Sequence, residues 1–186
     1  MAAILEAHAA GQLDFGENRV QELTEKHPQL PEARWHMIGR LQRNKVKYIA
    51  PYIHLIHSVD SQRLLKEIDK EAKKAGRRIN CLLQIDISHE EQKAGLDETE
   101  ASAILEQHTS YPNINFKGLM GMASFTDDTA LIQSQFEQLS EAFKRFQTFG
   151  LADFTELSMG MSGDYPIAIA EGATLVRIGS AIFGHR

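Results

Sequence analysis

The chain has 186 residues and a formal net charge of −5, with 20 basic and 25 acidic side chains. This acidic balance, with a sequence pI of 5.9, argues against a protein that binds nucleic acid through backbone phosphates. The single cysteine, Cys81, cannot form an intrachain disulfide, and no apolar run reaches bilayer length. We therefore expect a cytoplasmic protein without a nucleic-acid or membrane partner.

Hydrophobic periodicity predicts helices and strands in alternation along the whole chain. Helices are expected over residues 1–10, 19–26, 41–50, 61–75, 98–108, 128–149 and 166–171. Strands are expected over residues 13–15, 34–39, 52–60, 79–88 and 116–123, and two more follow near the C-terminus. No linker or low-complexity segment interrupts this pattern, which indicates a single domain over residues 1–186.

Seven strands that alternate with helices are typical of a parallel α/β fold with right-handed crossovers. Two architectures fit: an open, doubly wound sheet, or a TIM-barrel-like (β/α)8 fold whose first strand is absent from this chain. The strand at 79–88 favours the barrel, because one of its faces is apolar and the other becomes polar toward the C-terminal end, with Leu82, Gln84, Asp86 and Ser88. We therefore expect seven parallel barrel strands and a site at the C-terminal rim.

The strongest functional signal lies between Glu156 and Gly184. In the first strand Leu157, Met159 and Met161 form a bulky apolar face, while small residues form the other face and lead into the turn Ser162-Gly163. A second strand carries Arg177 and ends in the turn Gly179-Ser180. Each turn lies at the start of a helix, where free N–H groups favour a phosphate. Two alternatives stay open: ordinary tight turns, and a structural ion pair for Arg177.

Several sequence blocks resemble one known family. They are FGENRVQEL from Phe15, WHMIGRLQRNK from Trp35, HSVDS from His57, QIDIS with KAGL from Lys93, KGLMGMA from Lys117, ELSMGMSGDY from Glu156 and VRIGSAIFG from Val176. In this order, over nearly the whole chain, they resemble the pyridoxal phosphate homeostasis protein family. Its members are fold-type III binders of pyridoxal 5'-phosphate (PLP), similar to the N-terminal barrel of alanine racemase.

The resemblance implies a protein that binds, buffers and delivers PLP inside the cell without turnover. The implied partners are PLP itself and PLP-dependent apo-enzymes, and the implied assembly is a monomer or a weak dimer. The alternative is a fold-type III PLP enzyme, such as an amino-acid racemase or decarboxylase. A third possibility is a barrel enzyme acting on another phosphorylated small molecule, with Asp86 as its general base or, in the simpler interpretation, as an interior hydrogen-bond acceptor.

The resemblance also implies which residues bind the cofactor. The phosphate contacts are Ser162, Gly179 and Ser180, with Gly160 giving the backbone room. Arg177 resembles the arginine that faces the pyridine nitrogen. Asn18 and His36 resemble residues that line the ring pocket; the alternatives are a helix N-cap for Asn18 and a hydrogen-bonded core histidine for His36.

Family members begin with a strand that carries the lysine bonded to PLP, in an AVSKTKP-like motif, and this chain shows no such motif. We therefore expect noncovalent, weakened PLP binding. Lys93, after the strand at 79–88, is the best substitute amine, although a solvent-facing loop lysine is the simpler interpretation. No catalytic residue is expected. No metal site is expected either, because His54 and His57 are three residues apart on a strand and so point to opposite faces.

Overall fold

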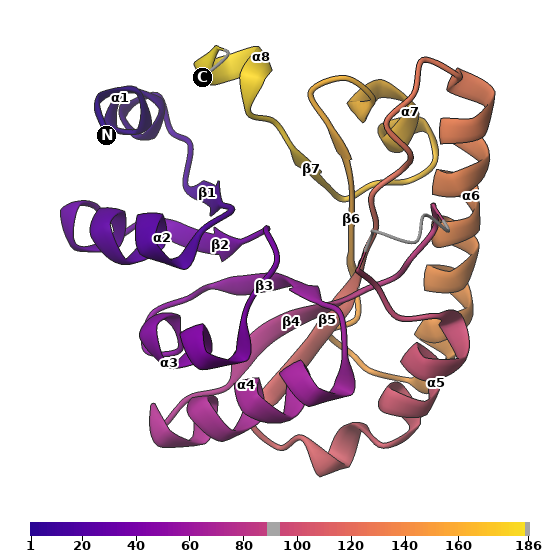
Figure 1. Ribbon diagram of the computed structural model, residues 1–186, viewed down its shortest axis with the longest axis horizontal. Coiled ribbons are helices and arrows are strands. Elements are labelled where there is room, and N and C mark those ends of the chain that lie inside the picture. Colours follow the sequence, from indigo (N-terminus) through magenta and orange to yellow (C-terminus); the bar gives the residue numbers. More distant parts are fainter. Residues whose placement is uncertain (89–93, 185–186) are drawn as a thin grey trace.

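The computed structural model describes residues 1–88 and 94–184. Within these ranges seven strands form one parallel sheet (Figure 1). The strands are β1 (Asp14–Glu17), β2 (Arg34–Met37), β3 (Leu55–Val59), β4 (Ile79–Gln84), β5 (Ile114–Met120), β6 (Glu156–Met161) and β7 (Leu175–Arg177). The predicted number of strands and their parallel direction are confirmed.

The strand order distinguishes the two architectures. Each strand pairs with the next in sequence, from β1 through to β7, whereas a doubly wound sheet reverses its order at a switch point. Figure 1 shows this sheet curving around an interior, with helices along its outer face. The structure thus confirms the barrel-like fold of seven strands, in which β1 and β7 form the two ends of the sheet.

The helices are α1 (Ala2–Ala9), α2 (Val20–Lys26), α3 (Val46–Ile49), α4 (Gln62–Lys74), α5 (Glu98–Glu106), α6 (Thr129–Phe146), α7 (Tyr165–Ala170) and α8 (Ser180–Phe183). The three longest begin at side-chain caps: Ser61 for α4, Asp97 for α5 and Asp128 for α6. At α5 the cap is reciprocal, because Glu100 accepts a bond from the Asp97 amide. Among the described residues no helix has both the length and the apolar character to cross a bilayer.

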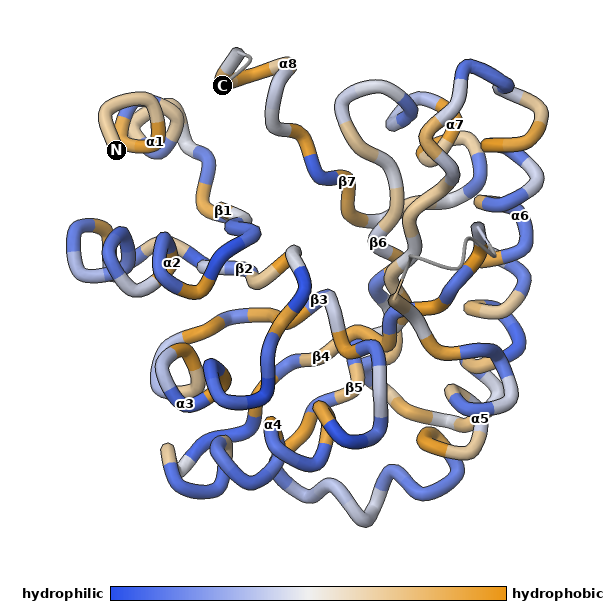
Figure 2. The backbone as a smooth tube through the Cα atoms, viewed as in Figure 1, coloured by the Kyte–Doolittle hydropathy of each residue, from blue (hydrophilic) through white to orange (hydrophobic). Residues whose placement is uncertain are grey.

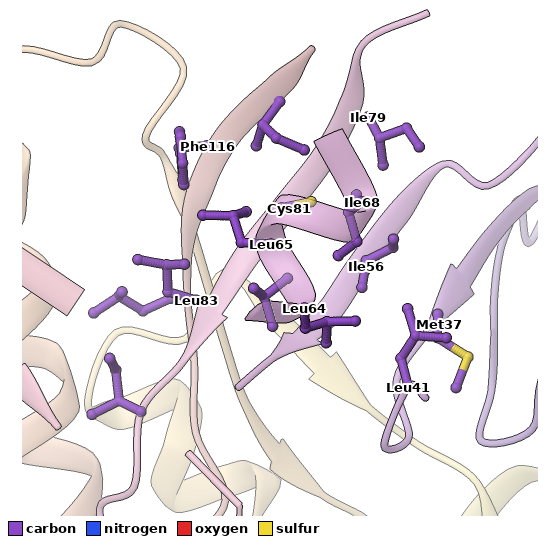
Figure 3. Close-up of a cluster of buried hydrophobic side chains, with 14 of the residues drawn as sticks. Met37, Leu41, Ile56, Leu64, Leu65, Ile68, Ile79, Cys81, Leu83 and Phe116 are labelled. Atoms are coloured by element: carbon purple, nitrogen blue, oxygen red, sulfur yellow. The ribbon is translucent and has the colours of Figure 1, made fainter. Parts of the chain in front are cut away.

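The main hydrophobic core lies between the sheet and the helices. In Figure 3, Leu64, Leu65 and Ile68 of α4 pack toward Ile56, Cys81 and Leu83 of the strands. In Figure 2, α4 is mostly hydrophilic with short hydrophobic stretches, while β3 is mostly hydrophobic. The helix is therefore amphipathic, and its hydrophobic residues are buried. Burial of each such leucine or isoleucine contributes about 1.5–3 kcal/mol relative to an exposed side chain.

A second, smaller cluster lies on the opposite face of the sheet, inside the barrel. It consists of Leu55, Leu82 and Met120, with Met122 and Leu175 packed against it. Leu82 therefore faces the interior, while Cys81 and Leu83 face the helices, as the alternation of the strand at 79–88 predicts. Polar side chains also lie inside the barrel, among them those of the site described below.

Several local predictions need correction. The strands expected over residues 52–60 and 79–88 are shorter, Leu55–Val59 and Ile79–Gln84, so His54 precedes its strand. The helix expected over residues 41–50 is a short 3-10 turn, Arg43–Lys45, followed by the four residues of α3. Met161, expected on the buried face of its strand, is 38% exposed, although Leu157 and Met159 are buried as predicted. Met161 is the last residue of β6, and its exposure marks the point where the strand leaves the core for the loop at Ser162.

Gly118 sets the spacing between β5 and β6, and its substitution tests that contact. It has φ +149°, and an added Cβ would lie 1.8 Å from the backbone oxygen of Glu156. Because both backbone strain and a clash with main chain result, we expect Gly118→Ala to lower the free energy of unfolding by about 3 kcal/mol or more in urea titrations. Gly76→Ala is the control: its φ is +66° but no atom lies within 4 Å, so about 1 kcal/mol is expected. Equal losses in the two variants would contradict this account of β5 and β6.

Candidate functional site

Two loops meet where β6 and β7 end. β6 ends at Met161 and leads into Ser162, while β7 ends at Arg177 and leads into Gly179. The Ser162 hydroxyl oxygen accepts hydrogen bonds from the backbone N–H groups of Gly179, at 3.2 Å, and Ala181, at 3.4 Å. The sequence prediction that these two small-residue turns lie together is therefore correct.

The two loops border open space. A Cβ added at Gly163 or at Gly179 would have no atom within 4 Å, so both glycines border open space. Gly179 and Ser180 are exposed, and the hydroxyl of Ser162 currently satisfies two amides of this turn. Since α8 has only four residues, these individual amides rather than a long helix dipole would hold a phosphate.

Gly160 contributes to the site through packing. It has φ +90°, and an added Cβ would lie 2.6 Å from the Ala168 Cβ and 3.1 Å from the Tyr165 Cα. The missing side chain lets α7 approach β6, which fixes the loop at Ser162 between them. This packing against α7 is a structural role, and the role of Gly160 in giving a bound phosphate room stays a prediction.

Arg177 points into the barrel from β7. Its guanidinium donates to the Ser158 hydroxyl at 2.7 Å and to the Gly121 backbone oxygen at 3.0 Å. Both acceptors are uncharged, so these bonds differ from the carboxylate ion pair that was the structural alternative. Two bonds from one planar guanidinium fix its orientation as well as its position.

A row of hydrogen bonds continues from Arg177 through the interior of the barrel. The Ser158 hydroxyl lies 2.8 Å from Nδ1 of His57, and Nε2 of His57 lies 2.9 Å from Nδ1 of His36. Nε2 of His36 in turn lies 3.1 Å from a carboxylate oxygen of Asp14. We call Arg177, Ser158, His57, His36 and Asp14 the interior relay.

The chemistry of its two ends gives the interior relay one direction. An arginine can only donate hydrogen bonds and an ionised carboxylate can only accept them. Ser158 therefore accepts from Arg177 and donates to Nδ1 of His57. The Nε2–H of His57 then donates to His36, and the Nε2–H of His36 donates to Asp14. This assignment makes both rings neutral with the proton on Nε2, and it satisfies every polar atom along the row.

The electrostatics agree with neutral rings. Burial lowers the pKa of His36 to about 4, although the neighbouring Asp14 carboxylate acts in the opposite direction. Burial also holds the pKa of His57 well below its usual range. Burial lowers the pKa of Arg177 to about 10, so the guanidinium remains charged at neutral pH.

The two residues expected to line a ring pocket, His36 and Asn18, differ in their surroundings. His36 is buried, and both of its ring nitrogens bond within the interior relay, as the core-histidine alternative describes. Asn18 is exposed just after β1; the N-cap of α2 is Arg19, so the cap alternative for Asn18 is wrong. Their contact with a cofactor ring stays a prediction, and Lys93 lies outside the described residues.

Sequence reasoning missed three members of the interior relay: Asp14, His57 and Ser158. Ser158 was placed on the small-residue face of its strand, but without a partner. A usable signal was present, because the strand alternation that puts Leu82 inside the barrel also puts polar residues there on other strands. What the alternation could not supply is which of these polar residues meet.

Comparisons with known proteins agree with this fold. The model of the family "Alanine racemase, N-terminal domain" matches residues 1–186. The curated pyridoxal phosphate homeostasis protein of Aquifex aeolicus is 38% identical over 185 residues, which cover 98% of this chain and 81% of that protein.

Two solved structures of PipY from Synechococcus elongatus are also similar. The structure without PLP has a TM-score of 0.93 at 41% identity, and the structure with PLP bound has 0.89 at 40% identity. Each match covers 98% of this chain and 87% of the PipY chain. The chain therefore belongs to the alanine racemase N-terminal domain family, among relatives that carry the name pyridoxal phosphate homeostasis protein.

Proposed function

We propose that this protein binds PLP between the loops at Ser162 and Gly179 and serves in PLP homeostasis. The observation that carries the proposal is the meeting of these two loops beside a charged guanidinium held inside the barrel. The names of its relatives and the PLP bound to PipY support the same reading.

The residues present fit the parts of PLP. The N–H groups of Gly179 and Ala181, which now donate to the Ser162 hydroxyl oxygen, would turn to the phosphate and hold it together with that hydroxyl, because these groups are the kind that bind phosphate oxygens. Arg177 would face the pyridine nitrogen, with the interior relay holding its guanidinium in place. PLP, when bound, supplies an aldehyde and an aromatic ring that can delocalise electrons.

The identity of Arg177 favours binding over turnover. A guanidinium stays charged at neutral pH even though burial lowers its pKa to about 10. Such a donor leaves a facing ring nitrogen unprotonated, which weakens the ring as an electron sink. A role in storing and passing on PLP, with PLP-dependent apo-enzymes as receivers, follows from this chemistry and from the names of the relatives.

The first test compares ligands with and without the phosphate. We expect PLP to bind at least about 100-fold more tightly than pyridoxal in absorbance or fluorescence titrations, because charge-assisted hydrogen bonds to the phosphate contribute about 1.5–3 kcal/mol each. Ser162→Ala should weaken PLP binding about tenfold. Equal affinity for PLP and pyridoxal would overturn the proposed cradle, and racemisation of alanine at an enzyme-like rate would overturn the role without turnover.

The second test concerns the positioning of Arg177. His57→Leu removes the acceptor of the Ser158 hydroxyl while keeping similar bulk, so the guanidinium loses its fixed support. We expect PLP binding to weaken about tenfold while binding of inorganic phosphate stays unchanged. His54→Ala is the matched control, since its ring lies next to His36 but outside the interior relay. An equal loss for PLP and phosphate would indicate general damage instead.

The third test uses the pH dependence of stability. The unfolded histidines have a pKa of about 6.5, whereas His36 in the folded protein has a pKa of about 4 and that of His57 is also lowered. The unfolded state therefore takes up protons first, and stability falls as pH decreases from about 6.5 toward 4. In urea titrations with a chelator present, His57→Leu should reduce the slope near pH 5 by about 1.4 kcal/mol per pH unit. An unchanged slope would contradict a neutral His57.

A further inference from the structure

A second group of polar side chains comes from β1, from β2 and from the residue just before β3. Asp14 is the first residue of β1, His36 lies on β2, and His54 directly precedes β3. One donor atom from each of these residues lies within 4.8 Å of the donor atoms of the other two. Asp14 and His54 lie at the amino ends of β1 and β3, and His36 lies within β2, whereas Ser162 and Gly179 follow the carboxyl ends of β6 and β7.

We propose that Asp14, His36 and His54 form a binding site for a divalent transition metal ion, with Zn²⁺ as the expected occupant. Two imidazole nitrogens and one carboxylate oxygen are a ligand set that zinc accepts, and sites with three protein ligands keep a fourth position for water. Asp14 and His54 are half-buried, so an ion and its water can reach the site. This inference does not depend on PLP binding.

The separations of the donor atoms fit a small ion. Ligands 2.0–2.1 Å from a tetrahedral zinc are about 3.3 Å from one another. Nε2 of His36 and Oδ1 of Asp14 are already 3.1 Å apart, with a proton between them in the present arrangement. An ion would take the place of that proton, and the His54 ring, whose centroid is 5.3 Å from that of His36, would complete the set.

Surrounding groups hold the three ligands in position. The other nitrogen of His36, Nδ1, lies 2.9 Å from Nε2 of His57. With an ion on Nε2 of His36, both rings would carry their proton on Nδ1, so that His36 donates to His57 and His57 donates to the Ser158 oxygen; this is the outer contact that metal-bound histidines usually have. Arg34 bonds to Oδ2 of Asp14 at 2.6 Å and leaves Oδ1 directed toward His36. The backbone of His54 is fixed on both sides, since its N–H donates to Trp35 and its carbonyl accepts from Asn80.

The ring of His54 has no other assigned role. Within residues 1–88 and 94–184 its nitrogens have no hydrogen-bond partner, although its backbone has two. The sequence predicted no metal site because it placed His54 and His57 on one strand, pointing to opposite faces. His54 instead precedes β3, so strand alternation does not separate its ring from the interior histidines. Its ring and that of His57 both lie beside His36.

Nearby positive charges limit the strength of the site. Arg34, Arg77 and Lys117 all act electrostatically on His54, and they oppose the approach of a cation. With only one carboxylate among the ligands, we expect weaker binding than in closed sites with four protein ligands. The site is thus a candidate for exchangeable metal rather than for a permanent structural ion.

Cobalt provides a direct probe, because Co²⁺ in a tetrahedral site absorbs visible light strongly. The whole chain, freed of metal by a chelator, is titrated with Co²⁺ and then with Zn²⁺. We expect one equivalent of Co²⁺ to produce the tetrahedral spectrum and Zn²⁺ to abolish it. His54→Ala should weaken Co²⁺ binding at least about tenfold, and His54→Cys, which supplies a thiolate, should restore it.

The control is His108→Ala, which removes a half-buried histidine that bonds to the Leu105 backbone oxygen. His108 is far along the chain from the three proposed ligands. This variant should leave Co²⁺ binding unchanged. Absence of saturable binding in the wild-type protein would overturn the proposal, as would a His54→Ala variant that binds within twofold of wild type. Thermal unfolding in chelator verifies that His54→Ala remains folded, so that lost binding reports the ligand itself.

Discussion

The hydrogen bond between His57 and Ser158 crosses the interior of the barrel and connects strands that are not neighbours in the sheet. His57 belongs to β3 and Ser158 to β6, with two further strands between them in the sheet order. Burying such polar groups is costly unless each one finds a partner. The interior relay meets this condition from Arg177 to Asp14, and the curvature of the sheet brings its members together.

The order and type of the elements could be predicted because they depend on local patterns. The caps Ser61, Asp97 and Asp128 and the alternation in β4 act within a few residues of the sequence. The helix at 41–50 was predicted too long, since its polar residues 43–45 form only a 3-10 turn before α3. The exact ends of the strands could not be predicted, because a strand can continue past the core, as β6 does at the exposed Met161.

The site could be predicted only in part. The adjacent turns at Ser162 and Gly179 follow from parallel strands that end at one rim, so sequence alone placed them together. The surroundings of His36 depend on Asp14 and His57, which lie 22 and 21 residues away along the chain. No local pattern specifies such partners, because they are selected by the closure of the sheet.

The bond between His57 and Ser158 also has a consequence for folding kinetics. Its two residues are 101 positions apart in the chain, whereas successive strands pair over much shorter separations. Contacts between distant positions require a large loop to close before they contribute, which slows the step that forms them. We therefore expect the bond between His57 and Ser158 to form after the pairing of successive strands.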